Sequence, residues 1–177
     1  MQVNLRKTAG SCLLFAVVLL STGALADPES DYSNGVKAYD ADDLITAMGL
    51  FERAAQAGHA KAQYLLGYIL DKAEDNAQAM SYYRQSADNG NGEAAYAVGT
   101  MYANADGVDR DYAQARDWFE KAAALGFLPA LETLGLAYIG GELGLEKDRA
   151  KGMALLQQAA DSGNESAAAH LQREQNL

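Results

Sequence analysis

The chain has 177 residues, and its 24 acidic residues outnumber its 14 basic residues, which gives a formal net charge of −10. Because Arg6 and Lys7 are the only charged residues before Asp27, the formal charge from Asp27 onward is −12. This charge argues against nucleic acid binding, which needs basic side chains to replace condensed counterions. It also argues against binding to anionic lipid through a cluster of basic residues. A hydrophobic fraction of 49% is too high for a disordered acidic chain.

Residues 1–26 have the three parts of a secretory signal peptide. Arg6 and Lys7 form the charged region, residues 12–20 are apolar, and Ala24-Leu25-Ala26 places small residues before a cleavage point. The alternative, a transmembrane anchor, is disfavoured because the apolar run is about half of the ~20 residues that span a bilayer. We therefore expect cleavage after Ala26 and a periplasmic or secreted mature chain. Since Cys12 is the only cysteine, that chain has no disulfide.

The remaining sequence repeats two sets of glycines. The first set recurs in steps of 32, 32 and 36 residues, and comprises Gly35, Gly67, Gly99 and Gly135. The second set ends each unit, and comprises Gly58, Gly90, Gly126 and Gly163. This pattern predicts four repeats, at about residues 27–58, 59–90, 91–126 and 127–164.

The second half of each repeat has the pattern of an amphipathic helix, here called helix B. Apolar or small residues stand 3, 4, 7, 8 and 11 positions before the closing glycine, which makes one stripe on an α-helix. An aspartate stands 15 positions before it, at Asp43, Asp75, Asp111 and Asp148. Aspartate there fits an N-cap, and the closing glycine fits the left-handed residue that follows a helix.

The first glycine set lies inside the preceding helix, helix A. A glycine inside a helix costs about 1 kcal/mol relative to alanine, so we expect it to permit close approach of helix B, whose facing positions are also Ala or Gly. In segment 165–177, Gln172 replaces this glycine and no helix B follows, which predicts a polar capping helix. The fold expected is an all-α, right-handed α-solenoid of four helix pairs plus this C-terminal cap helix.

The unit from Glu93 to Phe127 resembles the Sel-one-like repeat (SLR) family, a relative of the tetratricopeptide repeats. It carries Val98-Gly99 followed by Tyr102, the Gly107-Val108 loop, and Trp118 before a Lys-Ala-Ala run. The resemblance implies an interaction scaffold, often a secreted bacterial protein that regulates envelope signalling, exopolysaccharide export or secretion. Some members are immunity proteins against a secreted phospholipase toxin. A cysteine-rich branch has been credited with β-lactam binding or hydrolysis, but its paired cysteines are missing from this sequence.

No motif in the sequence supports an enzyme, a metal site or a cofactor. His59 and His170 have no partner at metal-ligand spacing. Residues 104–107 look like the centre of a calcium loop, but the flanking ligand positions do not hold Asp and Glu. Residues 140–144 are rich in glycine, but no Gly-Lys-Ser/Thr follows them. We therefore expect no catalytic residues, no metal and no cofactor.

Two columns of helix A residues are candidates for contact with a partner. One column stands three positions before the helix A glycine, and the other stands one position after it; the residues are Tyr32, Tyr64, Tyr96 and Glu132, and Val36, Tyr68, Thr100 and Leu136. In tetratricopeptide-like arrays these positions face the concave groove, where tyrosines make good anchors. The alternative is that the tyrosines only pack between neighbouring A helices.

These observations predict a periplasmic scaffold that recognises a protein partner, as a helix or an extended segment, in the concave groove. The charge of −12 favours a partner with a basic patch, through steering more than affinity. No nucleic acid partner and no stable membrane insertion after signal cleavage are expected. The alternative function is an immunity protein that neutralises a secreted, type VI phospholipase-like toxin in the periplasm.

Overall fold

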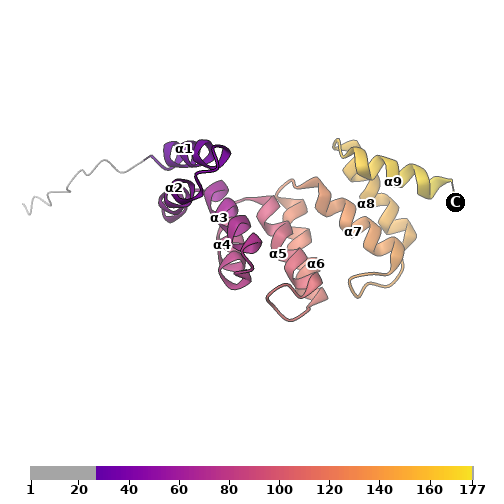
Figure 1. Ribbon diagram of the computed structural model, residues 1–177. Helices are drawn as coiled ribbons and strands as arrows, with labels where there is room; N and C mark the ends of the chain where they lie inside the picture. The colour runs from indigo at the N-terminus through magenta and orange to yellow at the C-terminus, as the bar shows by residue number, and fades with distance from the viewer. Residues whose placement is uncertain (1–26, 177) are drawn as a thin grey trace, which may run out of the picture.

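The computed structural model describes residues 27–176, so the expected signal peptide lies outside the described residues. The described residues are all-α, with no strand, and their helices follow one another along an arc whose first and last helices lie at opposite ends (Figure 1). The helices are α1 (Pro28–Asp40), α2 (Leu44–Gln56), α3 (Ala60–Lys72), α4 (Asn76–Asp88), α5 (Gly92–Asn104), α6 (Tyr112–Ala124), α7 (Leu128–Gly140), α8 (Arg149–Asp161) and α9 (Glu165–Gln175). The predicted solenoid of helix pairs with a C-terminal helix is confirmed.

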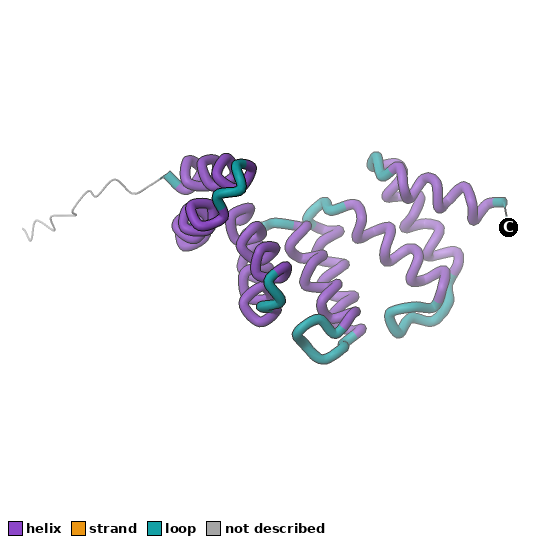
Figure 2. The backbone as a smooth tube through the Cα atoms, in the orientation of Figure 1, coloured by secondary structure: helices purple, strands orange, loops and turns teal. Residues whose placement is uncertain are grey.

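The helices alternate between two roles. Each A helix (α1, α3, α5 and α7) packs most extensively against the B helix that follows it (α2, α4, α6 and α8), and less against the preceding pair. Because the pairs are antiparallel, the turns from A to B lie along one edge of the solenoid and the turns from B to A along the other. The longer loops at 105–111 and 141–148 stand out on the A-to-B edge (Figure 2).

The ends of the B helices form as their sequence predicts. The carboxylate of Asp43 accepts a hydrogen bond from the Thr46 N–H at 3.1 Å, and Asp75, Asp111 and Asp148 cap their helices in the same way. The closing glycines all have a positive φ, from +83° at Gly58 to +98° at Gly163. These caps are local interactions, which is why the repeat pattern reveals them.

The helix A glycines do make room for helix B, but the prediction that alanine or glycine faces them holds only in part: in the first three repeats an aromatic ring lies closest, and only in the third does an alanine, Ala115, also approach the glycine, Gly99. A Cβ on Gly35 would lie 2.6 Å from the Phe51 ring, and the rings of Tyr83 and Phe119 occupy the same place in the next two repeats. In the fourth repeat Gly135 does face Gly152, and the side chain of Leu156 lies beside them. The reason is volume: these buried side chains fill the space between two helices that are otherwise lined with alanine.

Polar residues replace core residues at both ends of the array. At the first helix Asp31 stands where the later A helices bury Gln63, Ala95 and Leu131, and its carboxylate accepts a pair of hydrogen bonds from Arg53, at 2.6 and 3.0 Å. The hydrogen bonds from Arg53 lower the pKa of the Asp31 carboxyl, and partial burial opposes that shift.

At the other end, α9 buries Ala167 and Leu171 against α8, while Gln172 is exposed. The predicted C-terminal helix is therefore present, and Gln172 stands where the A helices carry their glycine. Among residues 27–176, no helix is both long enough and apolar enough to cross a bilayer.

Candidate partner-binding groove

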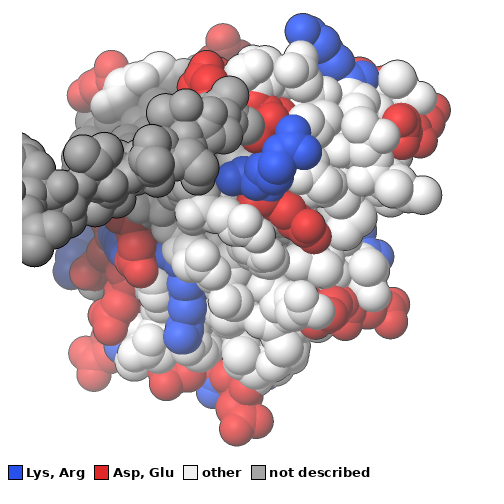
Figure 3. All heavy atoms as spheres, turned by 90° about the vertical axis from the view of Figure 1, so that its left-hand side faces the viewer, with Lys and Arg blue, Asp and Glu red and all other residues white. Residues whose placement is uncertain are grey.

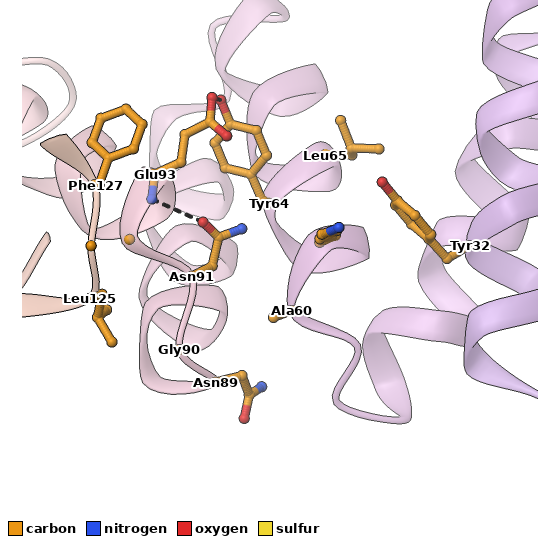
Figure 4. Close-up of a pocket in the computed structure, with 13 residues that line it drawn as sticks. Tyr32, Ala60, Tyr64, Leu65, Asn89, Gly90, Asn91, Glu93, Leu125 and Phe127 are labelled. Carbon is orange, nitrogen blue, oxygen red and sulfur yellow. Dashed lines mark hydrogen bonds between the residues drawn. The ribbon is translucent and has the colours of Figure 1, made fainter. Parts of the chain in front are cut away.

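A pocket of about 600 Å³ lies on the B-to-A edge, where three successive A helices begin (Figure 4). We call it the edge pocket. Apolar and polar side chains from four repeats line it, together with glycine backbone: Tyr32, Ala60, Lys61, Tyr64, Leu65, Asn89, Gly90, Asn91, Gly92, Glu93, Leu125, Gly126 and Phe127. Seven of these residues lie in helices, and the other six are the closing glycines Gly90 and Gly126 with the residues directly before and after them. The edge pocket is therefore a product of stacked repeats and not of any one repeat.

The turn from Asn89 to Glu93 forms the polar wall of the edge pocket. Gly90 has a φ of +91°, which turns the chain out of α4. Asn91 then caps α5, because its Oδ1 accepts from the N–H groups of Glu93 at 2.9 Å and Ala94 at 3.2 Å (Figure 4). This local bonding holds the wall in place before any ligand arrives.

Tyr32 lies at one end of the edge pocket, on the first A helix. Its ring stacks on the ring of His59, with centroids 4.5 Å apart. The Nδ1 atom of His59 accepts a hydrogen bond from the Ala62 N–H at 3.2 Å, and Nε2 lies 3.1 Å from a carboxylate oxygen of Glu29. Since Nδ1 is an acceptor, this arrangement assigns a neutral imidazole whose proton is on Nε2.

Tyr64 occupies the same position in the second repeat and lies at the middle of the edge pocket. Its hydroxyl donates to the Glu93 carboxylate at 2.8 Å, which joins α3 to α5. Burial, followed by the hydrogen bond and the charge of Glu93, raises the pKa of the Tyr64 hydroxyl well above its ordinary value. The hydroxyl therefore remains a donor throughout the physiological range.

Tyr96 continues the column away from the edge pocket. Its ring packs against Phe119 and Phe127 at centroid distances of 5.1 and 5.2 Å, and its hydroxyl shares a hydrogen bond with Thr133 at 3.1 Å. Tyr96 and Thr100 line a smaller pocket of about 200 Å³. The column thus lies along the inner seam between successive A helices.

Glu132 ends the column in the fourth repeat by the same kind of contact. Its carboxylate accepts hydrogen bonds from Asn164 at 3.0 Å and Ser166 at 2.6 Å, and it lies 3.5 Å from Nε2 of His170. These groups belong to the start and the body of α9. Every member of this column therefore contacts the next A helix, as the packing alternative predicts, while Tyr32 and Tyr64 also line the edge pocket.

The second predicted column is dispersed. Only Thr100 lines a pocket; Val36 and Leu136 are partly buried against the core, and Tyr68 is exposed with the Lys72 ammonium 5.4 Å from its ring centroid. The sequence reasoning missed lining residues at the starts of the A helices, such as Lys61, Asn91 and Phe127. The available signal was their position within three residues after a closing glycine.

The chemistry of the edge pocket is that of a recognition surface. Lys61 and Glu93 contribute one charge of each sign, and neither forms an ion pair within residues 27–176. Over the same residues, no three His, Cys, Asp or Glu side chains converge as a metal site would require. The apolar rings and amide groups can supply contact area and hydrogen bonds to a polypeptide.

The stacked helix pairs and the pocket across their edge place the protein among the helical-repeat proteins. The Sel1 repeat model matches residues 25–59, 60–91, 92–127 and 129–164, so the chain belongs to the Sel1 repeat family. Sel1 repeat proteins are generally scaffolds for protein interaction and are typically not enzymes.

Solved structures show the same fold. The uropathogenic Escherichia coli protective antigen c5321, which displays an SLR fold, is 29% identical with a TM-score of 0.75; the match covers 82% of this chain and 32% of the antigen. A Sel1 repeat protein from Oxalobacter formigenes is 24% identical with a TM-score of 0.76, over 86% of this chain and 65% of that protein.

Cysteine rich protein B of Helicobacter pylori is 18% identical with a TM-score of 0.52, over 85% of this chain and 98% of that protein. The chain thus spans about a third of the E. coli antigen and just under two thirds of the Oxalobacter protein. No curated protein matches the sequence.

Proposed function

We propose that this protein is a periplasmic scaffold that holds an extended segment of a partner protein in the edge pocket. The observation that carries the proposal is the pocket itself, about 600 Å³ in volume and lined from four repeats. That volume is in the range of a ligand site and suits a few residues of an extended chain better than the side of a helix. The periplasmic location rests on the expected signal peptide.

The lining supports a polypeptide partner. Leu125 is exposed and Phe127 partly buried, so both offer apolar area to an incoming side chain. The ammonium of Lys61 and the free oxygen of Glu93 can each bind a group of opposite charge, and the Asn91 side-chain N–H groups can donate to a peptide carbonyl. Together these groups provide both contact area and directional bonds.

Site-specific cross-linking tests the proposal directly. A photoreactive residue replaces Lys61 in the tagged full-length protein, and a control protein carries it at Gln157, an exposed position on α8. Irradiation of living cells should link one dominant protein from position 61 and not from position 157. The same cross-linked proteins from both positions, or no cross-linked protein from position 61, would rule out the edge pocket as the binding site.

The identity of the linked protein separates the two functions predicted from the sequence. An envelope sensor, exporter or secretion component would support a regulatory scaffold. A secreted phospholipase would support the immunity function, in which the scaffold occludes a toxin.

A substitution at Leu125 separates an effect on binding from an effect on stability better than truncation of the tyrosines does. The column tyrosines bridge neighbouring A helices, so their truncation would lower stability and binding together. Leu125 lies in a turn and is exposed, so Leu125→Asn should preserve the thermal midpoint while weakening cross-linking from position 61. An unchanged cross-linking yield would contradict the role given to Leu125.

A further inference from the structure

A second surface with unusual exposure lies at the turn between α1 and α2, on the edge opposite to the edge pocket. Among residues 27–176 six large apolar side chains are exposed, and three of them fall within this single turn. They are Tyr39, Leu44 and Ile45, with exposed fractions of 40%, 45% and 89%. We call these three residues the turn patch.

Comparison between repeats shows that folding does not require Ile45. The equivalent residues are Ala77, Ala113 and Ala150, all of which are exposed. At an exposed helix position isoleucine buries nothing, and its branched side chain favours the helix less than alanine does. The first repeat therefore exposes apolar area that the other three repeats avoid at the same position.

In later repeats, a loop of the same chain lies on the position equivalent to Leu44. Asn76 is the equivalent of Leu44 in the second repeat, and the loop of the third repeat lies on it, since a Cβ on Gly107 would lie 2.2 Å from the Asn76 Cβ. Likewise, Gly144 of the fourth repeat lies against Tyr112. Both loops are irregular, with left-handed residues such as Gly107 and Gly144, and each places an aliphatic residue, Val108 or Leu143, against the core.

Within residues 27–176, Leu44 lacks the kind of loop that lies on Asn76. The turn between α3 and α4 consists of residues 73–75 and lacks the additional residues that form the loops at 105–111 and 141–148. In the described part of the chain, the surface at the start of α2 is therefore open to a segment of another molecule.

The charge around the turn patch defines the chemistry of the partner. Asp40, Asp42 and Asp43 lie between Tyr39 and Leu44, and no ion pair within residues 27–176 involves them. Asp43 is held by its hydrogen bonds with Thr46, which lower the pKa of its carboxyl and keep it ionised.

Acidic residues also predominate along the rest of the A-to-B edge. Each turn carries three of them, against one basic residue (Lys72, Arg110 or Lys147) in each of the last three turns: Asp40, Asp42 and Asp43; Asp71, Glu74 and Asp75; Asp106, Asp109 and Asp111; and Glu142, Glu146 and Asp148. In the view onto the α1–α2 end, acidic side chains lie around the outline of the molecule, with uncharged surface and several basic side chains between them (Figure 3). An approaching cationic segment is therefore attracted toward this edge, whereas an acidic one is repelled.

We infer that the turn patch is a docking surface for a cationic segment of a partner protein, with an aliphatic side chain between Lys or Arg residues. The aliphatic side chain packs on Leu44 and Ile45. The basic residues pair with Asp40 and Asp42. This surface is separate from the edge pocket, so either can fail without the other.

The test uses a fluorescein-labelled synthetic peptide, Lys-Gly-Arg-Gly-Leu-Arg-Gly-Lys, and the mature protein, with binding followed by fluorescence anisotropy. A variant with Leu44→Asn and Ile45→Ala, the residues of the second repeat, should weaken binding about tenfold. Asp40→Asn with Asp42→Asn should weaken binding and reduce its dependence on salt. A peptide with Ser in place of Leu should bind as weakly to the native protein as the parent peptide binds to the apolar variant.

The matched control is Asp161→Asn with Glu165→Gln, which makes the same change of charge on the B-to-A edge. This pair should change the affinity less than about twofold, since it lies away from the turn patch. An equal loss of affinity in the two charge variants would show that the peptide responds only to the net charge of the protein, and would overturn the proposal. Unchanged binding in the Leu44/Ile45 variant would overturn it as well. Circular dichroism melts of each variant show whether the fold is retained.

Discussion

Gly67 on α3 lies directly against the ring of Tyr83 on α4: a Cβ added to the glycine would be 2.6 Å from Cδ1 of the ring. The same relationship joins Gly35 to Phe51 and Gly99 to Phe119, so three of the four helix pairs interlock in one way. A contact that close lies below the separation of packed carbon atoms, and the ring is buried, so it has little room to move.

We expect Gly67→Ala to destabilise the protein. Alanine gains about 1 kcal/mol of helix propensity, but overpacking a filled core costs about 1–3 kcal/mol, so the free energy of unfolding should fall by up to about 2 kcal/mol. Urea denaturation followed by circular dichroism measures this change.

Gly49 provides the matched control for that substitution. It also lies inside a helix, α2, but no atom lies within 4 Å of the place where its Cβ would be. Gly49→Ala should therefore raise the free energy of unfolding by up to about 1 kcal/mol. Opposite signs for the two glycines are the result expected, and a gain of stability in both would contradict the role of Tyr83.

His59 should act mainly as a helix cap, with its stacking on Tyr32 as a second contribution. His59→Ala removes the acceptor for the Ala62 N–H and should cost about 0.5–2 kcal/mol. His59→Asn restores an acceptor, as Asn91 and Asn164 do in later repeats, but not the ring stack. Its thermal midpoint should lie between those of the native and Ala proteins; a midpoint equal to that of the Ala protein would contradict the capping role.

The Asp31–Arg53 pair predicts a dependence of stability on pH. Because the pKa of the Asp31 carboxyl is lowered in the folded state, the pair contributes stability above the unfolded-state pKa of about 4. That contribution is lost as the pH falls through the folded-state pKa.

Asp31→Asn removes the titrating group, so the variant should be less stable than the native protein at pH 7, and the difference should shrink as the pH falls below about 4. Urea titrations at several pH values measure the difference. A difference that stays constant down to pH 2 would show that the lost interaction is not ionic.

The hydroxyl groups of Tyr64 and Tyr96 should stabilise the stacking of successive repeats. Tyr64→Phe removes the bond to Glu93, and Tyr96→Phe removes the bond to Thr133, each at an expected cost of about 0.5–1.5 kcal/mol. Tyr82 is a suitable control, because its hydroxyl has no hydrogen bond within the described residues and Tyr82→Phe should change stability little. Equal effects at all three positions would indicate a general loss of polarity instead of lost bonds.

The sequence alone was sufficient for the alternation of A and B helices and for the two ends of each B helix. The aspartate caps and closing glycines act within a few residues of themselves, so four repetitions of the pattern display them directly. The polar end of the array was also predictable, because Gln172 breaks the pattern at the position of the helix A glycine.

The partners of those residues were not predictable in the same way. Leu50 and Phe51 are adjacent large residues on the helix stripe, and only helix packing shows that the ring of Phe51 faces Gly35. The tyrosine column was visible in the sequence, but its bonds to the next A helix were not, since Tyr64 and Glu93 are separated by 29 positions.

The edge pocket and the turn patch depended most on the tertiary structure. The pocket brings together residues from position 32 to position 127, and the turn patch lies beside a neighbouring repeat whose corresponding turn is short. Local periodicity determines which residues form a helix, whereas the stacking of one repeat on the next determines which side chains are covered and which remain open to a partner.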